Sequence, residues 1–437
     1  MLKILFIPLL SFIFNANTLY SQWSSQKLSS KRTDVCSCKL GNKIFFIAGS
    51  TQTPSTATKT IDILDLITNT WSVKELKTPK SRPNCITYKD KIFVGGGGNA
   101  LENSKVIEVL DNNGNNIQSI IIPNAIGGLM LEKNGKIYVT SYGDMDVYDI
   151  ENGNWKNIRI PLSREVSLPR DNYGFVSTDN KIYLAGGGYF GEEYKQVSIF
   201  DISQNNWSID SLSMLRYGLL GETHKDRVYF IGGQGGDYKY YKTIEIFNET
   251  TKLWEKDSLS RGGRFDMTTI IHDEKLFVAG GQTFSFSDQF IDLIDVFDFN
   301  NKTWSILKLP TGRSSMTAIG AQNKVFFAGG RSDTEDYTDI VDIYEFIPSS
   351  IDDSSNFMNI KIYPNPVEEE LYIDFSFDKL QGPISLIINN SEGKVLISEI
   401  LTKSMPISVI GLVSGQYFVN VYDTKRNLIL AKSFIKL

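Results

Sequence analysis

The stretch NKIYLAGGG at residues 180–188 combines a turn residue, a cation, a short apolar and aromatic run, and three glycines. Nearly the same phrase occurs at six other places in the chain. They are NKIFFIAGS (42–50), DKIFVGGGG (90–98), GKIYVTSYG (135–143), DRVYFIGGQ (226–234), EKLFVAGGQ (274–282) and NKVFFAGGR (323–331). Successive phrases start 45 to 49 residues apart. A period in the forties is typical of a repeat architecture.

Each repeat is expected to contain four short strands, which we call a, b, c and d in chain order. Strand a precedes the glycine phrase, strand b lies within it, and strand c ends in an acidic or polar residue. Strand d begins six residues later, at a tryptophan in five repeats. The pairs are Asp65 with Trp71, Asp149 with Trp155, Asp201 with Trp207, Asn248 with Trp254 and Asp298 with Trp304. The second repeat keeps this spacing from Asp111 but has Ile117 in place of the tryptophan.

Four antiparallel strands in about 45 residues form one small sheet that cannot bury both of its faces alone. Stacking such sheets radially buries them against one another and leaves only short edges, which predicts a β-propeller. The phrase and its spaced tryptophan resemble the kelch repeat over residues 23–347, although the third repeat lacks the glycine pair. We therefore expect an all-β chain with a seven-bladed kelch β-propeller followed by a small C-terminal β-sandwich.

The ends of the repeat array predict how the ring closes. The last repeat stops after VDIYEF (341–346) without a tryptophan, whereas Trp23 stands near the N-terminus with no strand c before it. The segment QWSSQKLSS (22–30) is thus expected to supply strand d to the last blade, which removes two open sheet edges.

Residues 1–21 are expected to be a signal peptide. Lys3 precedes an apolar run from Ile4 to Phe14, and small polar residues follow around Ser21. A membrane anchor is the alternative. No other long apolar run follows, so the mature chain is not expected to span a membrane. The net charge of −5 and the absence of a basic tract argue against nucleic-acid binding.

The C-terminal part carries a second resemblance. A polar linker is expected at 348–359, and residues 360–437 show strand patterns separated by turn signals. YPNP (363–366), GLVSGQY (411–417) and the final KSFIKL resemble the type IX secretion (Por-type) sorting domain of Bacteroidota-like bacteria. The resemblance implies contact with the type IX machinery and export through the periplasm, leaving the protein secreted or on the outer cell surface. The alternative is an accessory binding sandwich.

The expected binding face carries the b–c and d–a connections, because the length variation lies in b–c. These segments are rich in aromatic residues, and the candidates for ligand contact are Tyr189, Tyr240 and Phe286. An arginine also precedes strand a in six repeats, and such groups suit anionic ligands. These arginines are Arg32, Arg170, Arg216, Arg264 and Arg313, eleven residues before the strand b cation, and Arg82, nine residues before it. The alternative is that the arginines bond loop carbonyls and hold neighbouring blades together.

The cysteines and histidines of the sequence do not predict a catalytic or metal-binding site. Cys36, Cys38 and Cys85 fall in strand a of two neighbouring repeats, and we interpret them as small buried thiols, although one disulfide is an alternative. His224 and His272 lie near a–b turns on the face opposite the arginines. No catalytic residue, metal or cofactor is therefore assigned.

Three functional hypotheses follow. The favoured one is a secreted or cell-surface propeller that binds a glycan or protein, with an anionic ligand suiting the arginines. An enzyme similar to the bacterial kelch sialic-acid mutarotases, or an epimerase of that kind, is the alternative, with acids at Glu165, Asp171, Glu192 or Glu193. The third is a structural surface protein that uses its blade rims for contacts.

Overall fold

The structure is a computed structural model of the whole chain. It describes residues 22–437 apart from 52–55, 100–101, 104, 125–127, 141–142, 162–172, 190–191, 237–238, 261, 286, 334–336, 347–360, 375–382, 391–394, 403–404 and 423–427. The expected signal peptide (1–21) and linker (348–359) lie outside these residues. The chain divides into two compact units, one formed by Trp23–Glu345 and the other containing Phe346–Leu437.

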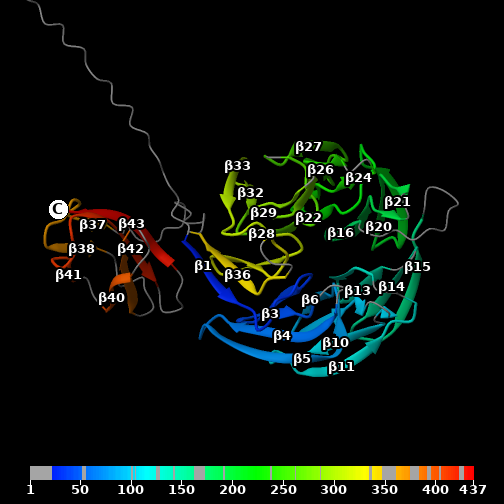
Figure 1. Cartoon of the computed structure of the whole chain (residues 1–437), viewed down its shortest axis with the longest axis horizontal. Helices are drawn as coiled ribbons and strands as arrows, with labels where there is room; N and C mark the ends of the chain where they lie inside the picture. Colours follow the sequence, from blue (N-terminus) through cyan, green and yellow to red (C-terminus); the bar gives the residue numbers. More distant parts are fainter. Residues whose placement is uncertain are drawn as a thin grey trace, which may run out of the picture. The chain divides into compact units, whose positions relative to one another are not determined.

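The first unit is a ring of four-stranded antiparallel sheets (Figure 1). Among its described residues, seven such sheets are present, and we number them as blades in chain order. Blade 1 holds β2 (Cys36–Leu40), β3 (Lys43–Ile47), β4 (Thr58–Asp65) and β5 (Thr70–Lys80); blade 2 holds β6 (Asn84–Tyr88), β7 (Lys91–Gly95), β10 (Val106–Leu110) and β11 (Asn116–Ile121); blade 3 holds β12 (Met130–Lys133), β13 (Lys136–Thr140), β14 (Asp144–Asp149) and β15 (Trp155–Arg159); blade 4 holds β16 (Gly174–Ser177), β17 (Lys181–Ala185), β20 (Gln196–Asp201) and β21 (Asn206–Ser211). Blade 5 holds β22 (Leu220–His224), β23 (Arg227–Ile231), β26 (Thr243–Asn248) and β27 (Trp254–Ser258); blade 6 holds β28 (Thr268–His272), β29 (Lys275–Ala279), β32 (Leu293–Asp298) and β33 (Thr303–Lys308); blade 7 holds β34 (Thr317–Ala321), β35 (Lys324–Ala328), β36 (Ile340–Glu345) and β1 (Gln22–Lys27).

The ring is closed by the contacts of the seven a strands. The strands β2, β6, β12, β16, β22, β28 and β34 each contact the next, and β34 contacts β2. The propeller fold expected from the repeats is thereby confirmed. In blade 7 the outer strand is β1, which lies beside β36 although more than 300 residues separate them (Figure 1). Trp23 packs on Tyr344, with ring centroids 5.3 Å apart.

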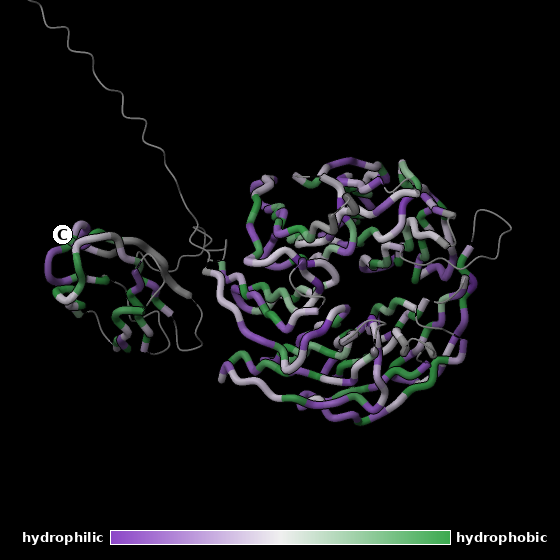
Figure 2. The backbone as a smooth tube through the Cα atoms, viewed as in Figure 1, coloured by the Kyte–Doolittle hydropathy of each residue, from purple (hydrophilic) through white to green (hydrophobic). Residues whose placement is uncertain are grey.

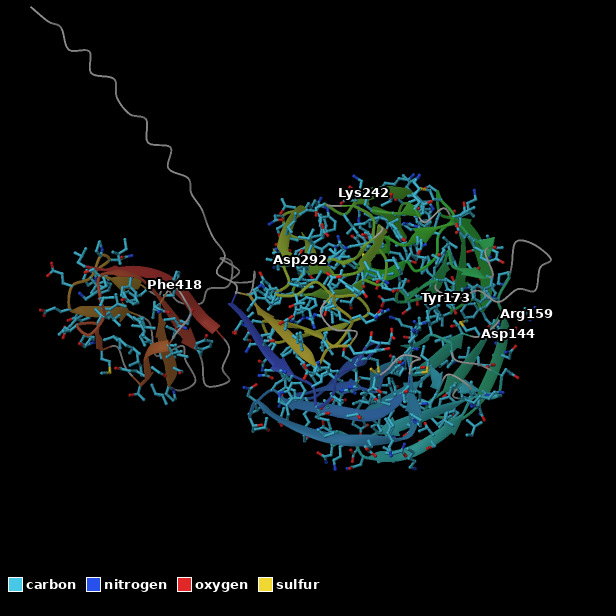
Figure 3. All side chains as sticks on the ribbon, viewed as in Figure 1. Asp144, Arg159, Tyr173, Lys242, Asp292 and Phe418 are labelled. Atoms are coloured by element: carbon cyan, nitrogen blue, oxygen red, sulfur yellow. The ribbon has the colours of Figure 1, made fainter. Side chains whose placement is uncertain are left out.

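The b strands form the buried part of each blade, because their apolar residues face neighbouring blades on both sides. In β3 the four residues after Lys43 are all buried. The apolar segments of the ring alternate with hydrophilic turns along the chain (Figure 2). Charged pairs such as Asp144 with Arg159, 3.3 Å apart across β14 and β15, occupy exposed positions (Figure 3).

The glycine pair after strand b is required by sterics. In blade 7, Gly329 and Gly330 have φ values of 66° and 102°, which favour glycine. A Cβ atom on Gly330 would lie 2.6 Å from the carbonyl oxygen of Ser314, and one on Gly329 would lie 2.6 Å from that of Arg32. Two d–a connections therefore pass close to the glycines, the one that enters blade 7 at Gly330 and the one that enters blade 1 at Gly329.

The tryptophans at strand d connect adjacent blades. Trp254 packs on Phe247 of its own strand c at a centroid distance of 5.1 Å. Its Nε1 donates to Asp210 of the preceding blade at 3.0 Å. Trp71 and Trp304 donate in the same way to Gln26 and Asp257. The six-residue spacing read from the sequence thus places an indole at successive outer seams.

In the described parts of the b–c connections, four form short two-stranded ribbons. These are β8 (Gly98–Asn99) with β9 (Glu102–Asn103), β18 (Gly188–Tyr189) with β19 (Glu192–Glu193), β24 (Gln234–Gly235) with β25 (Lys239–Tyr240), and β30 (Gln282–Ser285) with β31 (Ser287–Phe290).

The second unit contains two small sheets. One is formed by β37 (Lys361–Tyr363), β38 (Glu370–Asp374) and β41 (Pro406–Ser408), and the other by β39 (Ile384–Asn389), β40 (Val395–Leu401), β42 (Gly415–Tyr422) and β43 (Leu428–Lys436). Its own core includes Leu371, Leu386, Val419 and Phe434. Tyr417 is buried and donates from its hydroxyl to the carbonyl of Val413 at 2.7 Å.

Candidate functional site

Four of the six predicted arginines lie inside the blades. The guanidinium of Arg216 donates to the carbonyls of Gly232 and Thr243, both at 3.0 Å, and to Glu245 at 2.9 Å. Its side chain has no exposed surface. Arg32, Arg264 and Arg313 are buried in the same manner and pair with Asp62, Asp295 and Asp342. Burial lowers the pKa of Arg216, and the Glu245 carboxylate opposes this effect.

The backbone of these arginines joins one blade to the next. The carbonyl of Arg216 accepts from Gly187 of blade 4 at 2.9 Å, while its side chain binds blade 5. The carbonyl of Arg313 accepts from Gly281 at the same distance. This geometry corrects the expectation that the four arginines face a ligand. Their donors are used inside the sheets, as in the alternative interpretation that they hold the ring together.

Blade 2 uses a lysine at the equivalent position. Lys80, eleven residues before Lys91, is fully buried and donates from Nζ to the carbonyl of Val106 at 2.8 Å. The carbonyl of Lys80 accepts from Gly49 of blade 1, as those of the buried arginines do in other blades. Arg82, two residues later, is therefore not a member of the buried set.

Sequence reasoning missed the acidic partners, although a periodic signal was present. A carboxylate lies three residues before the acidic or polar residue that closes strand c in six blades, which in blade 2 is Asp111, directly after β10. These are Asp62, Glu108, Asp146, Glu245, Asp295 and Asp342, all buried, whereas blade 4 has Ser198. Several also accept a backbone N–H from the segment that enters the blade, such as that of Ser213 to Glu245 at 2.8 Å.

A second set of residues surrounds the axis of the ring, two positions after the buried cation. Asp34, Arg82, Asp266 and Ser315 all have φ between 49° and 53°. The N–H of Asp34 donates to the carbonyl of Ser315 at 3.0 Å. The N–H of Ser315 in turn donates to the carbonyl of Asp266, also at 3.0 Å. These bonds link the d–a connections that enter blades 6, 7 and 1 to one another in succession.

The side chains of this set form a charged group that we call the axial cluster: Asp34, Arg82, Asp266 and Arg331. Nε of Arg82 lies 3.5 Å from the Asp34 carboxylate, and 78% of the Arg82 side chain is exposed. Asp266 accepts from Gln282 at 3.0 Å. The surrounding protein raises the pKa of Asp34 and of Asp266, and Arg82 and Arg331 oppose both shifts. Residues of blades 1, 2, 6 and 7 thus act on one another electrostatically.

The axial cluster lies on the predicted face. Isolated bridges join the d–a and b–c connections, namely Thr33 with Ser50, Tyr217 with Gln234, Phe265 with Gln282, and Ser314 with Arg331. Of the predicted aromatics, Tyr240 stacks on Phe265 with centroids 5.4 Å apart. Arg170, Phe286 and the side chain of Tyr189 lie outside the described residues.

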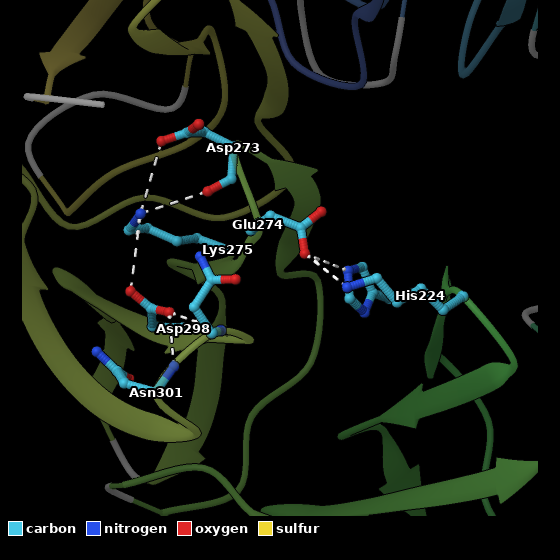
Figure 4. Close-up of polar contacts among 8 residues, drawn as sticks. His224, Asp273, Glu274, Lys275, Asp298 and Asn301 are labelled. Atoms are coloured by element: carbon cyan, nitrogen blue, oxygen red, sulfur yellow. Dashed lines mark hydrogen bonds and ion pairs between the residues drawn. The ribbon is translucent and has the colours of Figure 1, made fainter. Parts of the chain in front are cut away.

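The two histidines do not converge. His224 stacks on Phe299 of blade 6 with centroids 3.7 Å apart, and its Nε2 lies 3.1 Å from Glu274 (Figure 4). A groove of about 370 Å³ adjoins it between blades 5 and 6. His272 instead lies 2.7 Å from the carbonyl of Gln322. Within the described ranges, no group of three or more His, Cys, Asp or Glu side chains is arranged to hold a metal ion.

Comparisons with known proteins agree with this architecture. The Kelch motif matches residues 169–209 and 263–308. The chain is thus a kelch-repeat β-propeller protein. Residues 361–436 match the secretion system C-terminal sorting domain, so the propeller is joined to an export signal that directs it to the cell surface or the medium. Among the described residues, no helix has the length and apolar character needed to cross a bilayer.

Individual relatives are distant. Kelch-like protein 40 of Xenopus tropicalis and that of Xenopus laevis are each 25% identical over 186 residues, which is 41% of this chain. The aligned part is 29% of those proteins' own length.

Two solved structures are also similar. A fungal alcohol oxidase of the AA5 family in complex with copper matches with a TM-score of 0.60 and 12% identity, over 95% of this chain and 99% of its own. The structure of YjhT matches with a TM-score of 0.47 and 14% identity, over 74% of this chain and 97% of its own. At such identity the oxidase supports the fold alone.

Proposed function

We propose that the exported propeller is a binding protein whose ligand site is the axial cluster. The observation that carries the proposal is the convergence of Asp34, Arg82, Asp266 and Arg331 from four blades onto one face. The repeat does not need these charges for its own integrity, because Gly218 and Ser315 occupy the position of Asp34 in blades 5 and 7. Charges that stay at least partly exposed on a rigid scaffold, from 21% of the Asp34 side chain to 78% of that of Arg82, are suited to recognition.

The mixture of positive and negative side chains in the axial cluster indicates which chemical groups the ligand presents. Two carboxylates and two guanidinium groups favour a ligand that presents both acidic and basic groups, rather than a purely anionic one. A protein segment with neighbouring basic and acidic side chains meets this requirement better than an anionic glycan does. Tyr240 and Phe265, stacked beside Asp266, add an apolar surface for the same ligand.

The test uses the mature full chain on two arrays. One array carries peptides that vary the number and order of Asp, Glu, Lys and Arg, and the other carries anionic oligosaccharides. We expect saturable binding to mixed-charge peptides, weakened by salt. Arg82→Ala and Asp266→Asn should each weaken this binding about tenfold, which corresponds to about 1.4 kcal/mol.

Lys225→Ala is the matched control, because Lys225 lies at an a–b turn on the opposite face and forms an exposed ion pair with Glu274. It should leave the affinity unchanged. Binding that none of the axial variants affects would refute this location of the site. Binding confined to the oligosaccharides would replace the protein ligand by a glycan, and interconversion of sugar anomers would indicate an enzyme.

A further inference from the structure

We propose that Cys36 and Cys85 form a disulfide that ties blade 1 to blade 2 in the exported protein. The chain has three cysteines, and all of them meet at one seam of the ring. This inference is independent of any ligand.

The seam is formed by two neighbouring a strands. Cys36 and Cys38 lie on the same face of β2, and Cys85 lies on β6, which contacts β2. Cys38 belongs to the apolar cluster between the two blades, and Cys36 and Cys85 pack against that cluster. Besides burial, both other thiols contribute to raising the pKa of the Cys85 thiol, so either sulfur is a neighbour of Cys85.

An equivalent pair at the next seam shows how closely such side chains approach. Thr317 lies seven residues before the strand b lysine of blade 7, and Ser37 lies six residues before that of blade 1. Their hydroxyl oxygens are 2.7 Å apart. Cys36 and Cys85 have these same two positions in blades 1 and 2. The fold therefore brings this pair of side chains into direct contact, as a disulfide requires.

Accessibility selects Cys36 over Cys38 as the partner. Cys36 and Cys85 are partly exposed, whereas Cys38 is buried with 6% of its surface exposed. Burial raises the pKa of both Cys36 and Cys85, so few thiolates exist at neutral pH and uncatalysed oxidation is slow. The sorting domain directs the chain through compartments where disulfides form and persist.

The reaction is a thiol–disulfide exchange with a protein disulfide as the oxidant. One thiolate attacks the disulfide of the oxidant, which breaks that bond, forms a mixed disulfide and leaves the oxidant with one free thiolate. The second thiolate then attacks the protein sulfur of the mixed disulfide and displaces the other sulfur of the oxidant as a thiolate. The bond formed is Cys36 Sγ–Cys85 Sγ. The two protons and two electrons of the thiols pass to the oxidant, which leaves as a dithiol. Cys38 stays reduced.

The experiment is peptide mapping of the full chain recovered after export, alkylated under denaturing conditions and digested with trypsin without reduction. Cys36 and Cys38 share the tryptic peptide 33–39, and Cys85 lies in 81–89. We expect these two peptides to be joined, with one alkylated cysteine. Fragmentation between the two cysteines of peptide 33–39 should place the alkyl group on Cys38.

Serine variants make the assignment independent of fragmentation. Cys38→Ser should keep the link, and Cys36→Ser and Cys85→Ser should abolish it in most of the protein. A reducing agent should lower Tm by several degrees in the wild type and in Cys38→Ser, because the link closes a loop of about 50 residues. It should not change Tm in Cys85→Ser. Three alkylated cysteines in the exported wild type, or a link found between Cys38 and Cys85, would overturn the proposal.

Discussion

The buried arginines of blades 1, 5, 6 and 7 give the sharpest prediction. Replacing Arg216 by methionine removes the guanidinium that bonds Gly232, Thr243 and Glu245. Glu245 is 2% exposed and would remain buried without its cation, with the N–H of Ser213 as its other hydrogen-bond donor. Breaking a buried ion pair on one side costs about 3–5 kcal/mol, so we expect Arg216→Met to lower the free energy of unfolding by that amount.

The double variant Arg216→Met with Glu245→Met should be less destabilised than the single one. Replacing both partners removes the uncompensated carboxylate, and the cost that remains comes from the carbonyls of Gly232 and Thr243, about 1–3 kcal/mol. The assay is urea unfolding of the mature chain followed by tryptophan fluorescence. All six tryptophans lie between residues 23 and 304, so the signal reports the propeller alone.

Arg82→Met serves as the control, because its side chain is 78% exposed and lies outside the buried set. It should change the free energy of unfolding by less than about 0.5 kcal/mol. A loss below about 1 kcal/mol for Arg216→Met would refute the reasoning. So would a double variant that is as unstable as the sum of the two single variants, since the two groups would then not be coupled.

Three further predictions concern single residues. Burial lowers the pKa of Lys80 from 10.5 to about 8. Between these two pH values the unfolded chain binds more protons than the folded chain, so Lys80 makes the free energy of unfolding rise with pH. Lys80→Arg should lose this rise, which is measured by comparing urea midpoints at pH 8 and pH 10. Burial raises the pKa of Glu222 from 4.5 to about 7, so its stabilising effect is complete below pH 4.5 and is lost as pH rises through 7. As the pH rises from 5 to 8, the free energy of unfolding of Glu222→Gln should therefore increase relative to that of the wild type, by up to about 3 kcal/mol. The same dependence of stability on pH in both proteins would contradict the raised pKa of Glu222. Trp23→Ala should lower the free energy of unfolding by about 3 kcal/mol, because the Trp23 ring packs on Tyr344 and Phe327 in blade 7. If the urea midpoint in the fluorescence assay is unchanged, β1 does not hold the ring closed.

Much of the architecture could be read from local pattern. The glycine phrase fixes strand b and its turn, because only glycine fits where a d–a connection passes close by, as at Gly330. The six-residue spacing to tryptophan fixes the start of strand d, and the unpaired Trp23 indicated the strand that lies beside β36. These features recur along the chain at fixed spacing, so the period located them.

The sequence by itself determined the repeat, the order of strands and the face on which the connections vary. It did not decide which charges point inward. Arg32 lies eleven residues and Arg82 nine residues before a strand b cation, and these spacings did not show that the first is buried against Asp62 and the second is exposed beside Asp34. That difference depends on pairing between residues 30 to 50 positions apart and on a left-handed backbone two residues after the buried cation. Only the closed ring brings Asp266, Asp34 and Arg82, or the three cysteines, to one place, because each group is assembled from different blades.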